Sequence, residues 1–211
     1  IKKSVSVEGT GLHTGQHGTI TFHPAPAGHG VKFRRVDQKD QPIIPALIDN
    51  VVDTSRGTTI GINGIKVYTI EHVMASLTGL GIDNVLIDVD VDEMPIRDGS
   101  AKYFVEALEK AGLEVQDQLR EYIQIDHEIV LKNEEKGFEM RIVPSEEYVI
   151  DVTIDYNTEV LNVQHASLKH LSDFKNEIAP CRTFVFLHEL EFLLKNNLIK
   201  GGDLSNAIVF V

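Results

Sequence analysis

The sequence predicts an α+β fold built from two similar domains. Runs of alternating apolar and polar residues, separated by glycine and proline, predict antiparallel strands, and segments with helical spacing follow them. The same order of strands and then helices begins again near residue 120. Each domain, 1–118 and 119–211, is therefore expected to be a mostly antiparallel sheet with helices packed on one face.

The first strands are predicted by period-two alternation, which places every second side chain on the same face of a sheet. The apolar residues with this spacing are Val5, Val7, Ile20, Phe22, Val31 and Phe33. The glycine-rich GLHTG at 11–15 is expected to form a tight turn between strands. Further β-branched segments at 44–62 and 65–70 are also expected to contain strands.

The stretch TIEHVMASLTGLGIDN, residues 69–84, predicts the first helix. Val73, Leu77 and Leu80 share one helical face, and the GLG at 79–81 is expected to end the helix. NVLIDVDVD then predicts a buried strand. SAKYFVEALEKAG predicts a second helix, with Ser100 as its N-cap and Gly112 at its end.

The second half shows a comparable order of elements. Three strand-like runs and then two helical segments are predicted at 122–133, 137–144, 147–157, 168–178 and 185–202. TITFHPAPAGHGVKFRRV and FEMRIVPSEEYVIDVTID share a layout of strand, proline, polar turn and strand. Their residue identities differ, so an internal duplication is only a hypothesis from the sequence.

Composition restricts the class of protein. The 42% hydrophobic content of 211 residues is enough for a core, and the formal net charge of −12 argues against nucleic acid as the main partner. The single cysteine, Cys181, excludes an intramolecular disulfide and fits a reducing cytoplasm. No stretch approaches the ~20 apolar residues of a membrane span. A cytoplasmic protein without a transmembrane segment or export signal is expected.

Glu71 and His72 are adjacent titratable residues at the front of an apolar helix. Adjacent helical residues point about 100° apart, so at least one of the pair is expected to face a cleft. One interpretation is a carboxylate favoured by the helix dipole beside a surface histidine. The other is a metal-binding imidazole beside a carboxylate that acts as a base on metal-bound water. The pair by itself does not distinguish these interpretations.

Four motifs occur in order along the chain: GLHTG, IEHVMASLTGLGIDN, MPIRDGSAKYFVEAL and CRTFVF. With these motifs the chain, from about Val5 to Val209, resembles the UDP-3-O-acyl-N-acetylglucosamine deacetylases, which are zinc enzymes of lipid A synthesis. Four ordered motifs are far more specific than any one of them. Members of that family have two similar α+β domains with the active site between them, so the resemblance implies this arrangement here.

The resemblance implies a role for three residues in removing the N-acetyl group from an acylated UDP-N-acetylglucosamine. His72 would be a zinc ligand and Glu71 the general base that takes a proton from zinc-bound water. The hydroxyl of Thr183, in CRTF, would donate a hydrogen bond to the oxyanion. Without the resemblance, Thr183 is interpreted as an ordinary β-branched residue.

The segment at 184–209 resembles an insert that forms a hydrophobic passage for the substrate's acyl chain in the family. The passage-lining residues implied are Phe184, Leu190, Ile199 and Val209, and Phe186 resembles an aromatic residue near the nucleotide. The alternative is simple packing of these side chains against a sheet. Burial of a fatty acyl chain is favourable by about 0.8 kcal/mol per methylene, which would account for an apolar passage.

The chain also departs from the family pattern. Family members continue with an HKxxD segment that supplies a histidine and an aspartate to the zinc, and later a histidine that acts as general acid. The remaining zinc ligands are therefore expected in a C-terminal segment that follows Val211. Because catalytic zinc needs three protein ligands, residues 1–211 alone are expected to bind zinc poorly and to be inactive.

Two other hypotheses remain open from the sequence. The chain could be a non-enzymatic binding module, with a surface Glu-His pair and an apolar helix that contacts a partner. It could also be a metal hydrolase that acts on a different amide. The sequence does not indicate the acyl-chain length, the oligomeric state or the residues that contact UDP. Some members of the family are fused to a hydroxyacyl carrier-protein dehydratase, and the sequence does not indicate whether this chain is.

Overall fold

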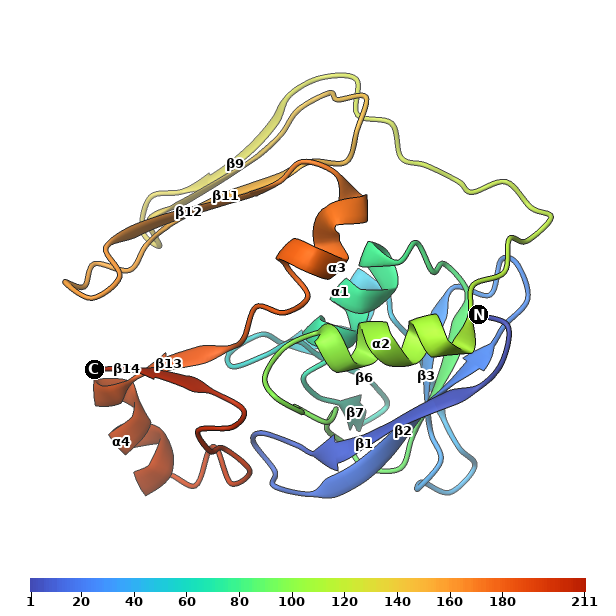
Figure 1. The fold of residues 1–211 in the computed structure, drawn as a ribbon, viewed down its shortest axis with the longest axis horizontal. Helices are drawn as coiled ribbons and strands as arrows, with labels where there is room; N and C mark the ends of the chain where they lie inside the picture. Colours follow the sequence, from blue (N-terminus) through green and yellow to red (C-terminus); the bar gives the residue numbers. More distant parts are fainter.

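The computed structural model describes residues 1–211, and its mixture of sheets and helices confirms the α+β class. A five-stranded sheet forms the centre of the N-terminal half (Figure 1). Its strands, in spatial order, are β1 (Val5–Thr10), β2 (His17–Pro24), β8 (Val85–Val89), β3 (Val31–Arg35) and β4 (Ile43–Pro45). Only the β3–β8 pair is parallel, so this sheet is mostly antiparallel, as predicted.

A smaller sheet and two helices complete this half. The sheet has the order β5 (Val51–Asp53), β6 (Thr59–Ile62) and β7 (Ile65–Val67), and a short 3₁₀ helix at Ile48–Asn50 precedes it. Helices α1 (Glu71–Gly79) and α2 (Lys102–Ala111) contact each other, and α2 contacts β1. Figure 1 shows both helices on the same side of the large sheet. The predicted helix end at Gly112 is confirmed by its positive φ of 74°.

The apolar core lies between that sheet and the helices. Its largest fully buried side chains include Phe22, Phe33 and Phe104, which come from two strands and from α2. Every second residue of β2 and β8 is buried, which confirms the predicted period-two pattern. Helix α2 is preceded by Ala101, and the predicted cap Ser100 accepts a hydrogen bond on its Oγ from the backbone N–H of Lys102 at 3.2 Å, while its hydroxyl donates to Asp98 Oδ1 at 2.7 Å.

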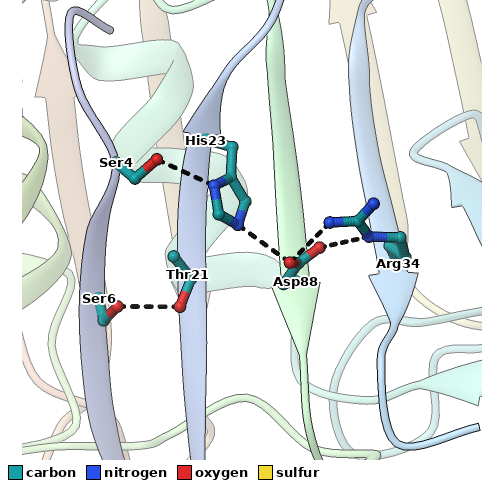
Figure 2. Close-up of polar contacts among 6 residues, drawn as sticks. All are labelled: Ser4, Ser6, Thr21, His23, Arg34 and Asp88. Carbon is teal, nitrogen blue, oxygen red and sulfur yellow. Dashed lines mark hydrogen bonds and ion pairs between the residues drawn. The ribbon is translucent and has the colours of Figure 1, made fainter. Parts of the chain in front are cut away.

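The opposite face of the large sheet is polar, and one network joins three of its strands and Ser4, the residue before β1 (Figure 2). Ser4 Oγ lies 2.9 Å from Nδ1 of His23, whose Nε2 lies 3.0 Å from Asp88 Oδ2. Arg34 donates from Nε and Nη2 to both Asp88 oxygens, at 2.7 and 2.8 Å. These pairs tie neighbouring strands together on the face that the helices do not cover.

Residues 112–167 include no buried residue. Two separate hairpins lie in this region: β9 (Ile129–Asn133) with β10 (Phe138–Ile142), and β11 (Ile150–Asp155) with β12 (Val163–Leu168). The three predicted strands are confirmed, whereas β12 was not predicted. The preceding connection stays attached to the first half as far as Arg120, which bonds Asp83 and the carbonyl oxygen of Gly81.

The last part of the chain returns to the N-terminal half. A 3₁₀ turn (Leu171–Asp173) and α3 (Phe174–Glu177) occupy the segment predicted as a longer helix. Phe174 is buried with Ala101 and Val105 in a second cluster, and its ring fills the space beside Gly79. The contact lies at the first residue of α3, which is only one turn long.

The segment at 184–210 forms a strand and helix unit. Strand β13 (Phe184–Phe186) pairs in parallel with β14 (Ile208–Phe210). Helix α4 (Leu187–Lys195) belongs to the connection that joins the two strands along the chain. The second predicted helical segment is thus partly strand, because its first residues belong to β13. The division into two similar domains at 118/119 stays a prediction. None of the four α-helices has the length and apolar character that a membrane crossing requires.

Candidate active site

Glu71 is the first residue of α1, and the loop before β6 holds its carboxylate. The backbone N–H of Thr58 donates to Glu71 Oε2 at 2.9 Å. At Gly57 an added Cβ would lie only 3.0 Å from Oε1, so the loop backbone approaches the carboxylate closely. The positive end of the helix dipole also favours a negative charge at this position. The carboxylate is therefore fixed at the start of the helix.

His72 is half-buried next to Glu71. Burial lowers the pKa of the imidazole below its ordinary value of 6.5, and this outweighs the opposing effects of Glu71 and Asp98. The ring is consequently neutral at pH 7, with a nitrogen lone pair that is able to bind a metal. No group of three His, Cys, Asp or Glu side chains suitable for a metal exists within residues 1–211. Taken alone, these residues do not fit a catalytic zinc site.

Thr183 lies against the turn that precedes α2. Its backbone N–H donates to the carbonyl oxygen of Gly99 at 2.7 Å, and its own carbonyl accepts from Ile208 at 3.1 Å. Arg182 Nε donates to the carbonyl oxygen of Asp98 at 2.6 Å. Asp98 is also the carboxylate whose charge acts on His72. The fold thus brings the CRTF segment to the turn beside the histidine.

A pocket of about 860 Å³ adjoins this segment, and 12 of its 19 lining residues are hydrophobic. It includes five of the residues predicted from the sequence: Thr183, Phe184, Leu190, Ile199 and Val209. The apolar side chains of α4 and of the segment after it therefore face a cavity as well as neighbouring side chains. Glu71 and His72 do not line this pocket.

Phe186 also lies outside the pocket lining. Its ring packs edge to face on Tyr156 and on Phe184, at centroid distances of 6.0 and 5.7 Å. It stacks on His188, with the centroids 5.6 Å apart and the planes at 19°. The predicted position of Phe186 near the nucleotide stays a prediction, and its observed contacts are those of an aromatic cluster.

Several pocket residues were not predicted as site residues. His13 and Arg56 line both the apolar pocket and an adjacent polar cleft of about 340 Å³. Arg56 Nη1 donates to the carbonyl oxygen of Leu198 at 3.0 Å, and His13 Nδ1 lies 2.9 Å from the same oxygen. His188 also lines the apolar pocket. No spacing in the sequence indicates these contacts, since they join residues more than a hundred positions apart.

Comparison with known proteins identifies the same family as the four ordered motifs. The model of the family described as "LpxC: UDP-3-O-acyl N-acetylglycosamine deacetylase" matches residues 1–211. A bifunctional enzyme LpxC/FabZ of Bacteroides thetaiotaomicron is 46% identical over 99% of this chain, and one of Chlorobaculum tepidum is 47% identical over 100%. In both cases the chain spans 45% of the relative's length.

A relative with a single activity in its name is also similar. The UDP-3-O-acyl-N-acetylglucosamine deacetylase of Syntrophotalea carbinolica is 42% identical over 99% of this chain, which covers 67% of that protein. The family match extends over every residue of the chain, and this identity is far above the level at which only the fold is shared. The chain therefore belongs to the LpxC family of UDP-3-O-acyl-N-acetylglucosamine deacetylases.

Proposed function

We propose that the protein removes the N-acetyl group of UDP-3-O-acyl-N-acetylglucosamine by zinc-dependent hydrolysis, as a step of lipid A synthesis. The observation that carries this proposal is the apolar pocket that contains Thr183 in its lining. A fatty acyl chain held there would place the attached sugar beside the segment that contacts the Asp98–Gly99 turn. The likeness to relatives that are named as deacetylases supports the same substrate.

Glu71 is the proposed general base. Its Oε2 is held by the N–H of Thr58, and the other oxygen remains available to take a proton from the attacking water. Thr183 is the proposed donor to the carbonyl oxygen of the acetyl group, whose negative charge grows during the attack. The backbone bond from Thr183 to Gly99 fixes the main chain that carries that hydroxyl.

His72 is the proposed first zinc ligand, and its lowered pKa keeps it in the neutral form that binds metal. Bound zinc supplies positive charge that makes water more acidic and stabilises an oxyanion. The further ligands are proposed to come from residues outside 1–211, because no group of three ligands exists within this range. This proposal is supported by relatives longer than the region that the chain matches.

The pocket is the proposed site of the acyl chain. Each methylene that leaves water there contributes about 0.8 kcal/mol to binding. Phe184 and Leu190 are proposed to contact the chain, together with Ile199 and Val209. Substrates with longer acyl chains should therefore bind more tightly, up to the length that the pocket accommodates.

The test is acetate release from acylated UDP-N-acetylglucosamine by the whole natural protein, together with its zinc content. Glu71→Ala should lower kcat by about 10²- to 10⁴-fold, the usual contribution of a general base, and leave about one zinc per chain. Glu106→Ala is the matched control, because the Glu106 side chain on α2 is 43% exposed and its only ion pair is a loose one with Lys102 at 3.9 Å. A natural protein that binds no zinc and releases no acetate would support a binding module instead.

A further inference from the structure

Glu93 is a fully buried carboxylate without a cationic partner. It is 1% exposed and takes part in no ion pair. Its Oε1 accepts hydrogen bonds from His13 N at 2.9 Å and from Thr69 Oγ1 at 3.1 Å. Its Oε2 accepts from the N–H and hydroxyl of Thr14, at 2.7 and 2.8 Å. A buried carboxylate is costly unless such donors are present, so these two chain segments must stay in place around it.

The first of these segments is the loop at 11–16. At Gly11 an added Cβ would overlap Oε2 of Glu93, so the carboxylate lies directly against the loop backbone. The same loop supports the chain that follows α4. Gly201 N donates to the carbonyl oxygen of Leu12 at 3.0 Å, and the His13 ring lies 2.9 Å from the carbonyl oxygen of Leu198. Leu12, His13 and Leu198 all line the apolar pocket.

The second segment leads into α1. Thr69 is buried and has a φ of 60°, an unfavourable value for a β-branched residue. Its hydroxyl bond to Glu93 Oε1 holds this conformation two positions before Glu71. The next residue, Ile70, donates its N–H to the carbonyl oxygen of Thr58, and the backbone N–H of Thr58 donates to Glu71 Oε2. Glu93 therefore contacts both the support of the pocket wall and the entry to the helix that begins with Glu71.

We propose that Glu93 is a positioning residue that sets the distance between the acyl-chain pocket and the Glu71–His72 pair. By holding the 11–16 loop against Thr69, it keeps the wall formed by Leu12, His13 and Leu198 in a fixed place relative to the helix. A long acyl chain bound against that wall would then hold the acetyl group at the reacting position. This inference rests on the proposed function.

The test uses the whole natural protein and two substrates, one with a long and one with a short 3-O-acyl chain. Glu93→Gln keeps the shape of the side chain, but the amide nitrogen that replaces one carboxylate oxygen is a donor. It would therefore face N–H and O–H groups that are donors themselves. It should raise KM for the long-chain substrate about tenfold, as expected when a charge-assisted hydrogen bond is lost. KM for the short-chain substrate should change less than about twofold. Glu93→Asp, which keeps two acceptor oxygens, should restore part of the difference.

A purely structural role gives a different result, because loss of folded enzyme lowers the apparent kcat for both substrates equally and leaves both KM values unchanged. Glu106→Gln is the matched control, on a half-buried glutamate whose only ion pair is a loose one with Lys102. If Glu93→Gln does not fold, Thr14→Val keeps the carboxylate and removes one donor, and the KM for the long-chain substrate should then rise about threefold. An unchanged ratio of the two KM values in the folded variant would overturn the proposal.

A separate measurement distinguishes failure of this inference from failure of the proposed function. Hydrogen exchange of the amides at 198–202 should be faster in Glu93→Gln than in the wild type, whatever reaction the protein catalyses. A wild type that is inactive on both substrates contradicts the proposed function alone. Unchanged exchange at Gly201, whose N–H donates to Leu12, would contradict the positioning role of Glu93.

Discussion

The backbone N–H of Thr183 donates a 2.7 Å hydrogen bond to the carbonyl oxygen of Gly99. This bond joins the start of the 184–210 strand and helix unit to the turn before α2. Gly99 has a φ of 84°, and the carbonyl oxygen of Asn206 occupies the space where a side chain would begin. The contact therefore requires glycine for two reasons, its backbone conformation and its lack of a Cβ.

Gly99→Ala should consequently be destabilising by about 3 kcal/mol, the sum of left-handed backbone strain and overpacking. Gly64→Ala is a matched control, because Gly64 has a φ of 83° and no atom within 4 Å of the added Cβ. The control should lose only about 1 kcal/mol. Urea unfolding of the two variants measures the difference, and equal losses would mean that the Asn206 contact yields without cost.

Phe174→Ala should weaken the attachment of the C-terminal part to α1 and α2. The ring is 5% exposed and fills the space beside Gly79. Its removal leaves a cavity and should cost about 3 kcal/mol of unfolding free energy. Phe192→Ala is the control, since Phe192 is 63% exposed, and it should change that free energy by less than about 0.5 kcal/mol. Similar losses in thermal unfolding would show that Phe174 is not an anchor.

Leu190→Trp should narrow the apolar pocket. Excluding about two methylenes of an acyl chain would raise KM for a long-chain substrate about tenfold and leave a short-chain substrate almost unaffected. Leu187→Trp makes the same change on α4 at a residue that is 44% exposed and does not line the pocket. Steady-state kinetics with both substrates compare the variants. An equal rise in the KM for the long-chain substrate in both variants would mean that the acyl chain binds elsewhere.

Asp88→Asn should change how stability depends on pH. Partial burial raises the pKa of Asp88, but the hydrogen bonds and charge of Arg34, with those of His23, outweigh it and hold the pKa below 3.8. A lowered folded-state pKa contributes stability above the unfolded value, and this contribution is lost as the pH falls through the folded value. The gap in unfolding free energy between wild type and variant should therefore be constant near pH 7 and shrink below pH 3.8.

Asp49→Asn is the control for that experiment, because Asp49 is exposed and forms no ion pair. Urea unfolding at a series of pH values gives the comparison. In Asp88→Asn the group at position 88 does not titrate, so it adds no pH dependence to the stability of the variant, whereas the wild type loses the stabilisation by Arg34 when Asp88 is protonated. A gap that stays constant down to the lowest pH would contradict the lowered pKa.

Much of the N-terminal half could be predicted from sequence. Val5, Ile20 and Phe22 lie at the predicted period, and α1 and α2 end near the predicted glycines. Alternation and glycine positions report local backbone preferences, which the core then stabilises. The later helices were less predictable. Phe174 and Phe184 belong to segments whose length and type depend on contacts with Gly79 and with β14.

Some residues of the candidate site could be predicted from the sequence, and others could not. The pair Glu71–His72 and the residue Thr183 were identified by motifs, and the structure places Thr183 in the lining of an apolar pocket. Glu93 and Arg56 were not predicted to belong to the site. Glu93 becomes informative only when its donors His13 and Thr69 are known, because an isolated glutamate in a sequence does not indicate burial.

By itself, the sequence determined the α+β class, the strands and helices of the first half and the family, because hydrophobic period, glycine punctuation and motif order are properties of short segments. Only the tertiary structure decided that the 11–16 loop, Glu93 and the 198–202 segment form one support for the pocket. The physical reason is that these contacts join residues far apart in the chain, and their geometry depends on the path of the whole backbone between them.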